Sequence, residues 1–229
     1  MGIGHSGSTI LSILLSKHKE VISLGELIKQ DKVKDKTQLC SCDKPMNECE
    51  IWGKGNYNFL KDYIVDSSRN LNRLKDLIKQ NNEVKVIYLD RDIRGLSLSI
   101  DIKQKSVNIN KWFPFIFVGL LKQKYMIRKS LKNNNIDYIN INYEDLVFNT
   151  DGTLNKIFNY IGLDSKGYNE NNKVNHHIIC GNRIKTDKHK KNNIVYDTSW
   201  FNNLKVNLLY LFFYPLIKVL WRNENEKNN

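Results

Sequence analysis

The chain has 229 residues, of which 41% are hydrophobic and 26% are charged, and this composition is typical of one globular domain. It excludes a largely disordered or collagen-like chain. Lys and Arg outnumber Asp and Glu by 36 to 24, and the net charge of +12 favours an anionic ligand, nucleic acid or an acidic membrane surface. Four cysteines are too few for a disulfide framework, and the first residues do not resemble a secretory signal, so we expect a single cytoplasmic domain over residues 1–229.

Short β-branched segments alternate with longer segments of helical period, which is the pattern of βαβ units and a parallel sheet. Strands are predicted at residues 20–23, 63–66, 84–89 and 136–142. Helices are predicted through Leu71, Leu74 and Ile78, over 113–131, over 154–161 and over about 197–221. Pro114 falls in the first turn of the second helix, and the third is expected to have Asp151 as its N-cap and to end at Gly162.

Glycines and small side chains dominate the first residues, Gly2-Ile3-Gly4-His5-Ser6-Gly7-Ser8-Thr9. Their spacing is that of the phosphate loop G-x-x-x-x-G-K-[ST], with Ser8 in place of the lysine. Backbone N–H groups of such a loop converge on an anion at the positive end of the following helix, whereas the missing ammonium disfavours an ATPase. An ordinary turn before a helix is the alternative. Since the loop begins at residue 2, we expect a three-layer, P-loop-like α/β fold with a central parallel sheet whose first strand is missing or truncated.

A second anion site is predicted where the strand at 84–89 meets the next helix. Arg91 follows that strand, Asp92 is the expected helix N-cap, and Ser99 lies on a later turn. Open α/β sheets bind ligands at the carboxyl ends of their strands, and the planar fork of a guanidinium suits phosphate. Arg91 and Ser99 can share one anion if the arginine side chain lies back along the helix. The alternative is an arginine that pairs with Asp92 or with carbonyl groups at the strand end.

Together these two segments resemble the sulfotransferases that use 3′-phosphoadenosine 5′-phosphosulfate (PAPS), in particular the bacterial type. The segment Gly4-His5-Ser6-Gly7-Ser8-Thr9 is similar to the 5′-phosphosulfate loop of that family, and Arg91-Asp92-Ile93-Arg94 with Ser99 is similar to its 3′-phosphate signature. Further matches follow in the family order: Gly25-Glu26-Leu27, Asp66-Ser67-Ser68-Arg69, Tyr143-Glu144-Asp145-Leu146 and Gly181-Asn182-Arg183. The resemblance spans residues 2 to about 183.

The resemblance implies that residues 2–10 and 91–99 bind PAPS, the first through the 5′-phosphate and the second through the 3′-phosphate. The residues implied in binding are Gly4, His5, Ser6, Gly7, Ser8, Thr9, Arg91, Ser99 and, at the 3′-phosphate or the adenine, Arg183. His5 stands where the family usually has Lys or Arg to neutralise the leaving phosphate. An imidazole is only partly protonated near neutral pH, so a tolerated loop residue is the alternative interpretation of His5.

Sulfuryl transfer needs an in-line acceptor hydroxyl, a base and charge-stabilising donors, and it requires no metal. We expect Glu26 to be the base, since the matching glutamate has this role in tyrosylprotein sulfotransferases; the alternative is that Glu26 caps the next helix. The expected reaction moves a sulfonate from PAPS to a hydroxyl of a carbohydrate, a glycolipid or another acceptor. Alternatives are an inactive or truncated homologue, a nucleotide kinase, and a basic RNA-binding protein, although no RNA-recognition motif is present.

Three cysteines, Cys40, Cys42 and Cys49, resemble a cysteine-containing insertion of some bacterial sulfotransferases that often ends in Trp, as here at Trp52. Three thiolates can bind zinc with a His or Cys180 as fourth ligand, but Cys-x-Cys-x6-Cys is not a standard zinc spacing. We therefore expect no metal and a reduced loop that faces the substrate.

The C-terminal part combines a basic run at 185–191 with a helical apolar stripe. The basic run is either a solvated face or a surface that captures an acidic acceptor or anionic lipid. The stripe is expected to pack on the core, and peripheral contact with a membrane is the alternative. Its residues are Leu204, Leu208, Phe212, Leu216 and Val219.

Overall fold

The structure is a computed structural model that describes residues 1–30, 33–53, 63–80, 83–109, 112–172, 176–180 and 195–225. Its strands are β1 (Val21–Gly25), β2 (Tyr63–Asp66), β3 (Val86–Asp90) and β4 (Tyr138–Asn142). Its helices are α1 (Ser8–Leu15), α2 (Leu27–Gln30), α3 (Leu71–Lys79), α4 (Ile93–Ser106), α5 (Phe113–Asn133), α6 (Tyr143–Phe148), α7 (Thr150–Ile161) and α9 (Leu204–Asn225), with a short 3-10 turn η1 (Ser165–Gly167). The four predicted strands are confirmed with small shifts in their ends.

Local signals explain most helix ends. Asp92 accepts a hydrogen bond from the backbone N–H of Arg94 at the start of α4, as predicted. Gly162 ends α7 with a φ of 82°, in the left-handed region that glycine tolerates. The prediction that Asp151 caps α7 is wrong, because the side chain of Asn149 accepts the hydrogen bond from Gly152 N.

The described strands form two parallel pairs, β1 with β2 and β3 with β4. Next to β3, Leu89 N donates a hydrogen bond of 2.8 Å to Met1 O, and Gly2 forms a parallel bridge with Leu89. Met1 and Gly2 thus lie parallel to β3 beside its carboxyl end. A cavity of about 800 Å³ is lined by both β2 and β3, with α1 and α3 around it.

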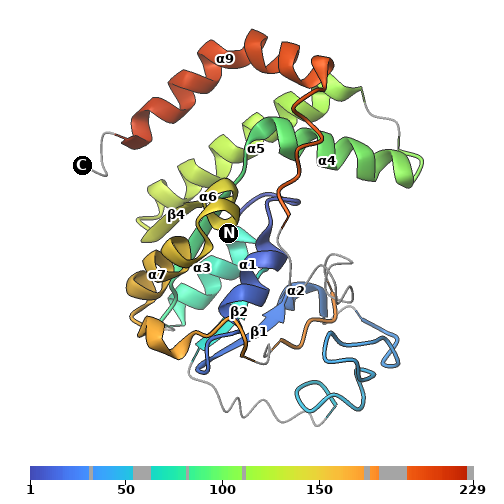
Figure 1. The fold of residues 1–229 in the computed structure, drawn as a ribbon, viewed down its shortest axis with the longest axis vertical. Helices are drawn as coiled ribbons and strands as arrows, with labels where there is room; N and C mark the ends of the chain where they lie inside the picture. Colours follow the sequence, from blue (N-terminus) through green and yellow to red (C-terminus); the bar gives the residue numbers. More distant parts are fainter. Residues whose placement is uncertain are drawn as a thin grey trace.

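Helices cover both faces of the β3–β4 pair (Figure 1). Successive side chains of a strand point to opposite faces, so Leu89 packs with α1 and α7 whereas Tyr88 packs with α3 and α5. A further apolar core joins α4, α5 and α9 at one end of the molecule. The predicted three-layer α/β arrangement with parallel strands is confirmed.

The C-terminal helix differs from its prediction in two ways. It begins at Leu204 and not near residue 197, because turns precede it and Asn203 accepts a hydrogen bond from Val206 N at its start. The predicted packing of the apolar stripe is also wrong: the side chains of Leu204, Leu208, Phe212, Leu216 and Val219 are exposed. The opposite face of α9 packs on the core instead, through Val206, Leu209, Tyr210, Phe213 and Ile217.

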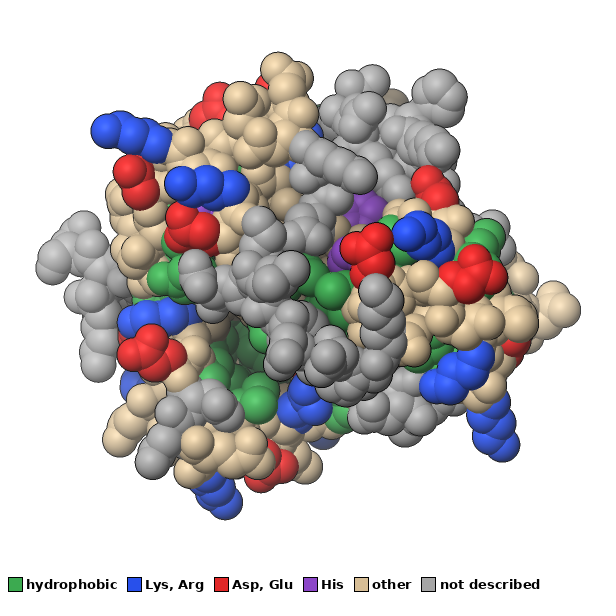
Figure 2. Space-filling model, turned by 90° about the horizontal axis from the view of Figure 1, so that it is seen from below, with side chains coloured by type: hydrophobic (Ala, Val, Ile, Leu, Met, Phe, Trp, Pro, Cys, Tyr) green, Lys and Arg blue, Asp and Glu red, His purple; other side chains and the backbone are tan. Residues whose placement is uncertain are grey.

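None of the helices within the described ranges is long and apolar enough to cross a membrane. The space-filling view from below shows how charge is distributed on one face of the molecule (Figure 2). Basic and acidic side chains are interspersed among the described residues of that face, and they do not gather into a broad basic area.

Candidate functional site

The glycine loop folds tightly over the carboxyl end of β3. Gly7 has a φ of 96° and directly precedes α1, and a side chain at this position would place its Cβ 2.6 Å from the ring of Tyr143. Only glycine fits such a backbone and such an approach. Ser6 is fully buried, and its Oγ has no hydrogen-bond partner among the described residues, whereas Gly4, His5, Ser8 and Thr9 are partly exposed.

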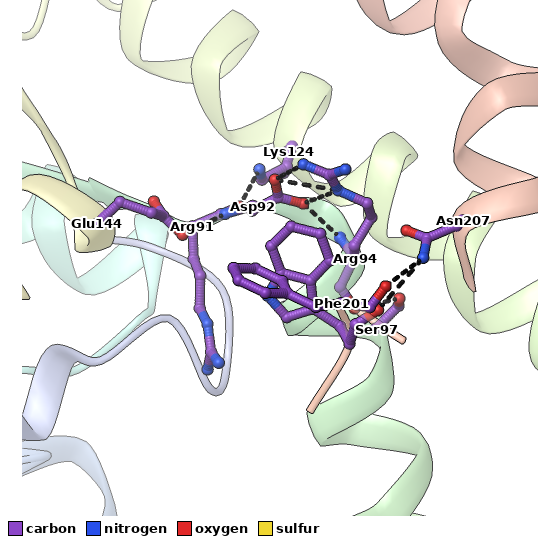
Figure 3. Close-up of polar contacts among 9 residues, drawn as sticks. Arg91, Asp92, Arg94, Ser97, Lys124, Glu144, Phe201 and Asn207 are labelled. Atoms are coloured by element: carbon purple, nitrogen blue, oxygen red, sulfur yellow. Dashed lines mark hydrogen bonds and ion pairs between the residues drawn. The ribbon is translucent and has the colours of Figure 1, made fainter. Parts of the chain in front are cut away.

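The side chain of Arg91 reaches the glycine loop. Its Nη1 donates a hydrogen bond of 2.9 Å to His5 O, and the guanidinium lies over the ring of Tyr143 at 4.6 Å. Figure 3 shows that the side chain of Arg91 extends away from Asp92 and Arg94. The alternative pairing with Asp92 is not found, since Asp92 is bound to Arg94. Arg91 is therefore aimed at the mouth of the glycine loop.

The backbone that carries Arg91 is held by a buried ionic cluster. Lys124 Nζ, from α5, donates a hydrogen bond of 2.6 Å to Arg91 O and forms an ion pair with Asp90. Arg128 Nη2 contacts the other carboxylate oxygen of Asp90 at 2.7 Å. Glu144 accepts a hydrogen bond of 3.1 Å from Asp92 N, which fixes the next residue as well. Two cations around one carboxylate make the end of β3 rigid and its surroundings electropositive.

Ser99 also meets the glycine loop. Its Oγ lies 3.0 Å from Nδ1 of His5, and His5 has a φ of 70°, in a region that side-chain-bearing residues rarely adopt. Backbone strain of this kind concentrates at ligand sites. Burial, with the charges of Lys103, Arg69 and Arg91, lowers the pKa of His5 from 6.5 to about 4. The imidazole is therefore neutral at pH 7 while no anion is bound.

The titration of His5 is the first prediction. Because folding lowers its pKa below 6.5, the neutral form favours the folded state above pH 6.5, and this stability is lost as the pH falls toward 4. A bound phosphate would stabilise the imidazolium, so we expect adenosine 3′,5′-bisphosphate (PAP) to raise the pKa of His5 above its value in the free protein. NMR titration of the His5 ring, assigned with a His5→Gln variant, measures both values. A pKa that stays near 4 with PAP bound would place the imidazole away from the phosphates.

Glu26, at the end of β1, lies close to the loop through a bridging arginine. Its Oε1 accepts a hydrogen bond of 2.6 Å from Arg69 Nη2, and its Oε2 forms an ion pair with Lys29. The alternative role as a helix cap is not found, because the first backbone N–H groups of α2 bind Asp66 and Ser68. Lys29 is the more exposed of the two cations, so a substrate hydroxyl reaches Glu26 most easily on the Oε2 side.

Arg69 is a functional candidate to which the sequence analysis assigned no role. Its Nη1 lies 3.4 Å from the position that a Cβ on Gly4 would occupy. Gly4 and Arg69 both line an open pocket of about 390 Å³ beside the loop, and residues of α5 line its other side. A guanidinium thus stands next to a phosphate loop that lacks its usual lysine. The available signal was the position of Arg69 in the segment Asp66-Ser67-Ser68-Arg69.

Asp197 is the second residue that the sequence did not single out. Its Oδ2 accepts a hydrogen bond of 3.0 Å from Arg91 Nη2. Burial opposes ionisation, but hydrogen bonds from Ser199 and the charge of Arg91 lower the pKa of Asp197 below its usual value. The carboxylate of Asp197 therefore binds the guanidinium of Arg91, the group that the resemblance implies would bind a 3′-phosphate. Arg183, the remaining predicted binding residue, lies outside the described residues.

Competition between Asp197 and a bound anion is the second prediction. We expect Asp197→Asn to bind PAP about threefold to tenfold more tightly, since the variant removes a partly exposed ion pair and a negative charge from the guanidinium. Isothermal calorimetry measures the change. Asp164→Asn is the control, because this carboxylate caps η1 away from the loop. Weaker PAP binding by Asp197→Asn would show instead that Asp197 orients Arg91 for the ligand.

The site thus combines loop amides, two guanidinium groups, a hydroxyl and a carboxylate, a set of groups suited to a phosphorylated ligand and a proton transfer. No protein-family model matches the chain, and no curated protein matches it significantly. Among solved structures, it is similar to the crystal structure of mouse sulfotransferase SULT7A1 complexed with PAP, with a TM-score of 0.60, 16% sequence identity, and coverage of 98% of this chain and 83% of that chain. At this identity the likeness concerns the fold, and the chain has the α/β fold of a sulfotransferase.

Proposed function

We propose that the protein is a sulfotransferase that moves a sulfonate from PAPS to a hydroxyl group. The observation that carries the proposal is the meeting of two distant segments at His5: Arg91 binds its carbonyl, and Ser99, from the same segment as Arg91, lies against its ring. The two segments expected to bind the 5′- and 3′-phosphates are thereby adjacent. The mouse sulfotransferase of similar fold was crystallised with PAP, which supports the same donor class.

The residues present fit a doubly phosphorylated adenosine. The N–H groups of the glycine loop and Arg69 would hold the 5′ end, and Arg91 with Ser99 would hold the 3′-phosphate. The carboxylate of Asp197 already pairs with the guanidinium of Arg91, so the guanidinium is able to bind an anion in this geometry. PAPS, when bound, supplies the activated sulfonate. Sulfonate transfer needs no metal at these residues, because the cations that surround the loop can stabilise the developing charge.

Glu26 would take the proton of the acceptor hydroxyl. The hydroxyl displaces Lys29 from Oε2, while Arg69 keeps its contact with Oε1 and orients the carboxylate. The loop amides and Arg69 would face the leaving phosphate of bound PAPS, and His5 would gain charge only when an anion raises its pKa. Proton removal and charge stabilisation thus fall to different residues at one site.

We further propose that the acceptor is a glycan carried on a lipid. The exposed apolar side chains of α9, among them Leu208 and Phe212, and the net charge of +12 support contact with an anionic membrane surface. Cosedimentation with vesicles of anionic phospholipid tests this contact. Replacement of Leu208 and Phe212 by serine is expected to abolish binding, and the same replacement at exposed Val107, on α4's C-terminal side, is the control. Equal binding by all variants would contradict a role for α9.

Calorimetry with nucleotides tests the function. We expect PAP to bind about 10- to 100-fold more tightly than 5′-AMP, because a charge-assisted contact with the 3′-phosphate is worth about 1.5–3 kcal/mol. Preference for ATP would favour the nucleotide kinase. Salt-sensitive RNA binding without PAP affinity would favour the RNA-binding protein. PAP binding with no sulfonate transfer to any glycan or glycolipid would identify an inactive homologue.

A further inference from the structure

Four metal-binding side chains converge at a place that the proposed reaction does not use. They are Cys40, Cys42, Cys49 and His177, and their ligand atoms all lie within 4.8 Å of one another. Cys42 Sγ and Cys40 Sγ lie 3.7 Å and 3.8 Å from Cys49 Sγ. His177 Nδ1 lies 3.2 Å from Cys49 Sγ and 4.0 Å from Cys40 Sγ. The histidine comes from a segment more than 120 positions further along the chain.

These separations are those of a tetrahedral zinc site. With Zn–S bonds of about 2.3 Å and a Zn–N bond of about 2.0 Å, two sulfurs lie about 3.8 Å apart and a sulfur and a nitrogen about 3.5 Å apart. The cysteines are free thiols, with sulfurs far beyond the roughly 2.05 Å of a disulfide. We propose that Cys40, Cys42, Cys49 and His177 bind one Zn²⁺ ion in a closed, structural site. Each thiol loses its proton to solvent as its sulfur binds the metal.

The backbone around the sulfurs supports the assignment. Cys40 N donates a hydrogen bond of 2.9 Å to Lys44 O, and Asp43 has a φ of 68°, so the chain turns sharply and brings Cys40 and Cys42 together. The backbone N–H of Cys42 faces the sulfur of Cys40, and those of Ile51 and Trp52 face the sulfur of Cys49. Such N–H groups offset the negative charge of metal-bound thiolates.

A second layer of contacts positions the histidine. Trp52 Nε1 donates a hydrogen bond of 2.8 Å to His177 O, and His177 N donates one of 2.7 Å to Ser23 O in β1. The backbone of His177 is therefore held from both sides before any ion binds. Trp52 thus holds the backbone of His177, and the three cysteines of the same segment complete the metal site with the ring of that histidine.

The site also explains how residues 33–53 keep a fixed fold. This segment contains no helix or strand, and its small core consists of Cys40, Met46, Cys49 and Ile179. Cys40 and Cys49 are nevertheless almost fully buried. A metal that ties three positions of this segment to His177 supplies the stability that so small an apolar core lacks. This role differs from the reduced, metal-free loop that the cysteine spacing alone favours.

Metal analysis of the full-length chain tests the proposal. After dialysis, elemental mass spectrometry is expected to find about one zinc per chain. Replacement of zinc by Co²⁺ is expected to give the intense visible absorption of tetrahedral cobalt with thiolate ligands. Cys49→Ala and His177→Ala should lose the metal, and Cys180→Ser, which changes a cysteine outside the four ligands, should keep it.

If the ligand variants fail to fold, measurements on the wild-type protein still decide whether the site binds zinc. A chelator is expected to release the zinc and lower the thermal stability of the wild type and of Cys180→Ser alike. Wild-type protein without zinc, with four reactive thiols and no cobalt absorption, would overturn the proposal. A disulfide among the three cysteines, or full metal content in Cys49→Ala, would also overturn it. None of these outcomes depends on sulfotransferase activity.

Discussion

Replacing Arg91 with lysine is expected to weaken PAP binding about 10- to 100-fold, because lysine keeps the charge but loses the planar fork that matches a phosphate. In the structure both terminal nitrogens of Arg91 already donate to oxygen acceptors, His5 O and Asp197 Oδ2. The side chain is therefore oriented to bind a phosphate through both of its terminal nitrogens. Calorimetry with PAP measures the loss, and circular dichroism checks that the fold is retained.

The control for this variant is Arg73→Lys. Arg73 forms an ion pair with Asp66, so the substitution changes an ion-paired arginine without touching the loop. Its affinity for PAP should stay close to that of the wild type. Unchanged affinity in Arg91→Lys as well would remove Arg91 from the 3′-phosphate site, and an equal loss of affinity for PAP and 5′-AMP would move its contact to another part of the nucleotide.

Replacing Glu26 with glutamine is expected to reduce the rate constant of sulfonate transfer about 10²- to 10⁴-fold, the usual contribution of a general base. PAP affinity should change little, since Glu26 contacts Arg69 and Lys29 and not the loop itself. The release of PAP from PAPS, in the presence of glycan and glycolipid acceptors, measures the rate. Calorimetry on the same preparation measures the affinity.

Glu20→Gln is the control for the base. Glu20 lies just before β1, at the end remote from Glu26, and pairs with Lys19 at the surface. Its variant should transfer sulfonate as fast as the wild type. If Glu26→Gln also kept the wild-type rate, Glu26 would have no role as the base, and its ion pairs would serve only to position Arg69.

Local sequence signals predicted those parts of the site that are formed by residues close together in the sequence. The strand that ends at Asp90, the cap at Asp92 and the glycine loop each lie within a few residues, so spacing alone indicates their structure. Arg69 and Asp197 could not be predicted in this way. Their roles arise from contacts with Glu26 and Arg91 across 43 and 106 positions of the chain, which depend on the assembled fold.

The orientation of α9 illustrates a different limit. A helical stripe marks a face, but apolar residues occur nearly all around this helix, and their pattern does not say which side meets the core. Val206 and Ile217 are buried, whereas Leu208 and Phe212 are exposed. The proposed zinc site shows the same limit, because the spacing of Cys40, Cys42 and Cys49 contains no information about a histidine as distant as His177.

The buried cluster of Lys124, Arg128 and Asp90 has a consequence for handling the protein. Two cations share one carboxylate directly behind Arg91, and burial lowers the pKa of Lys124. An anion bound beside this cluster offsets its positive charge. Because such an anion binds only the folded state, it stabilises the protein against unfolding. The melting temperature should therefore be higher in sulfate or phosphate buffers than in chloride. Ligand screens by thermal shift will be most sensitive in buffers without multivalent anions.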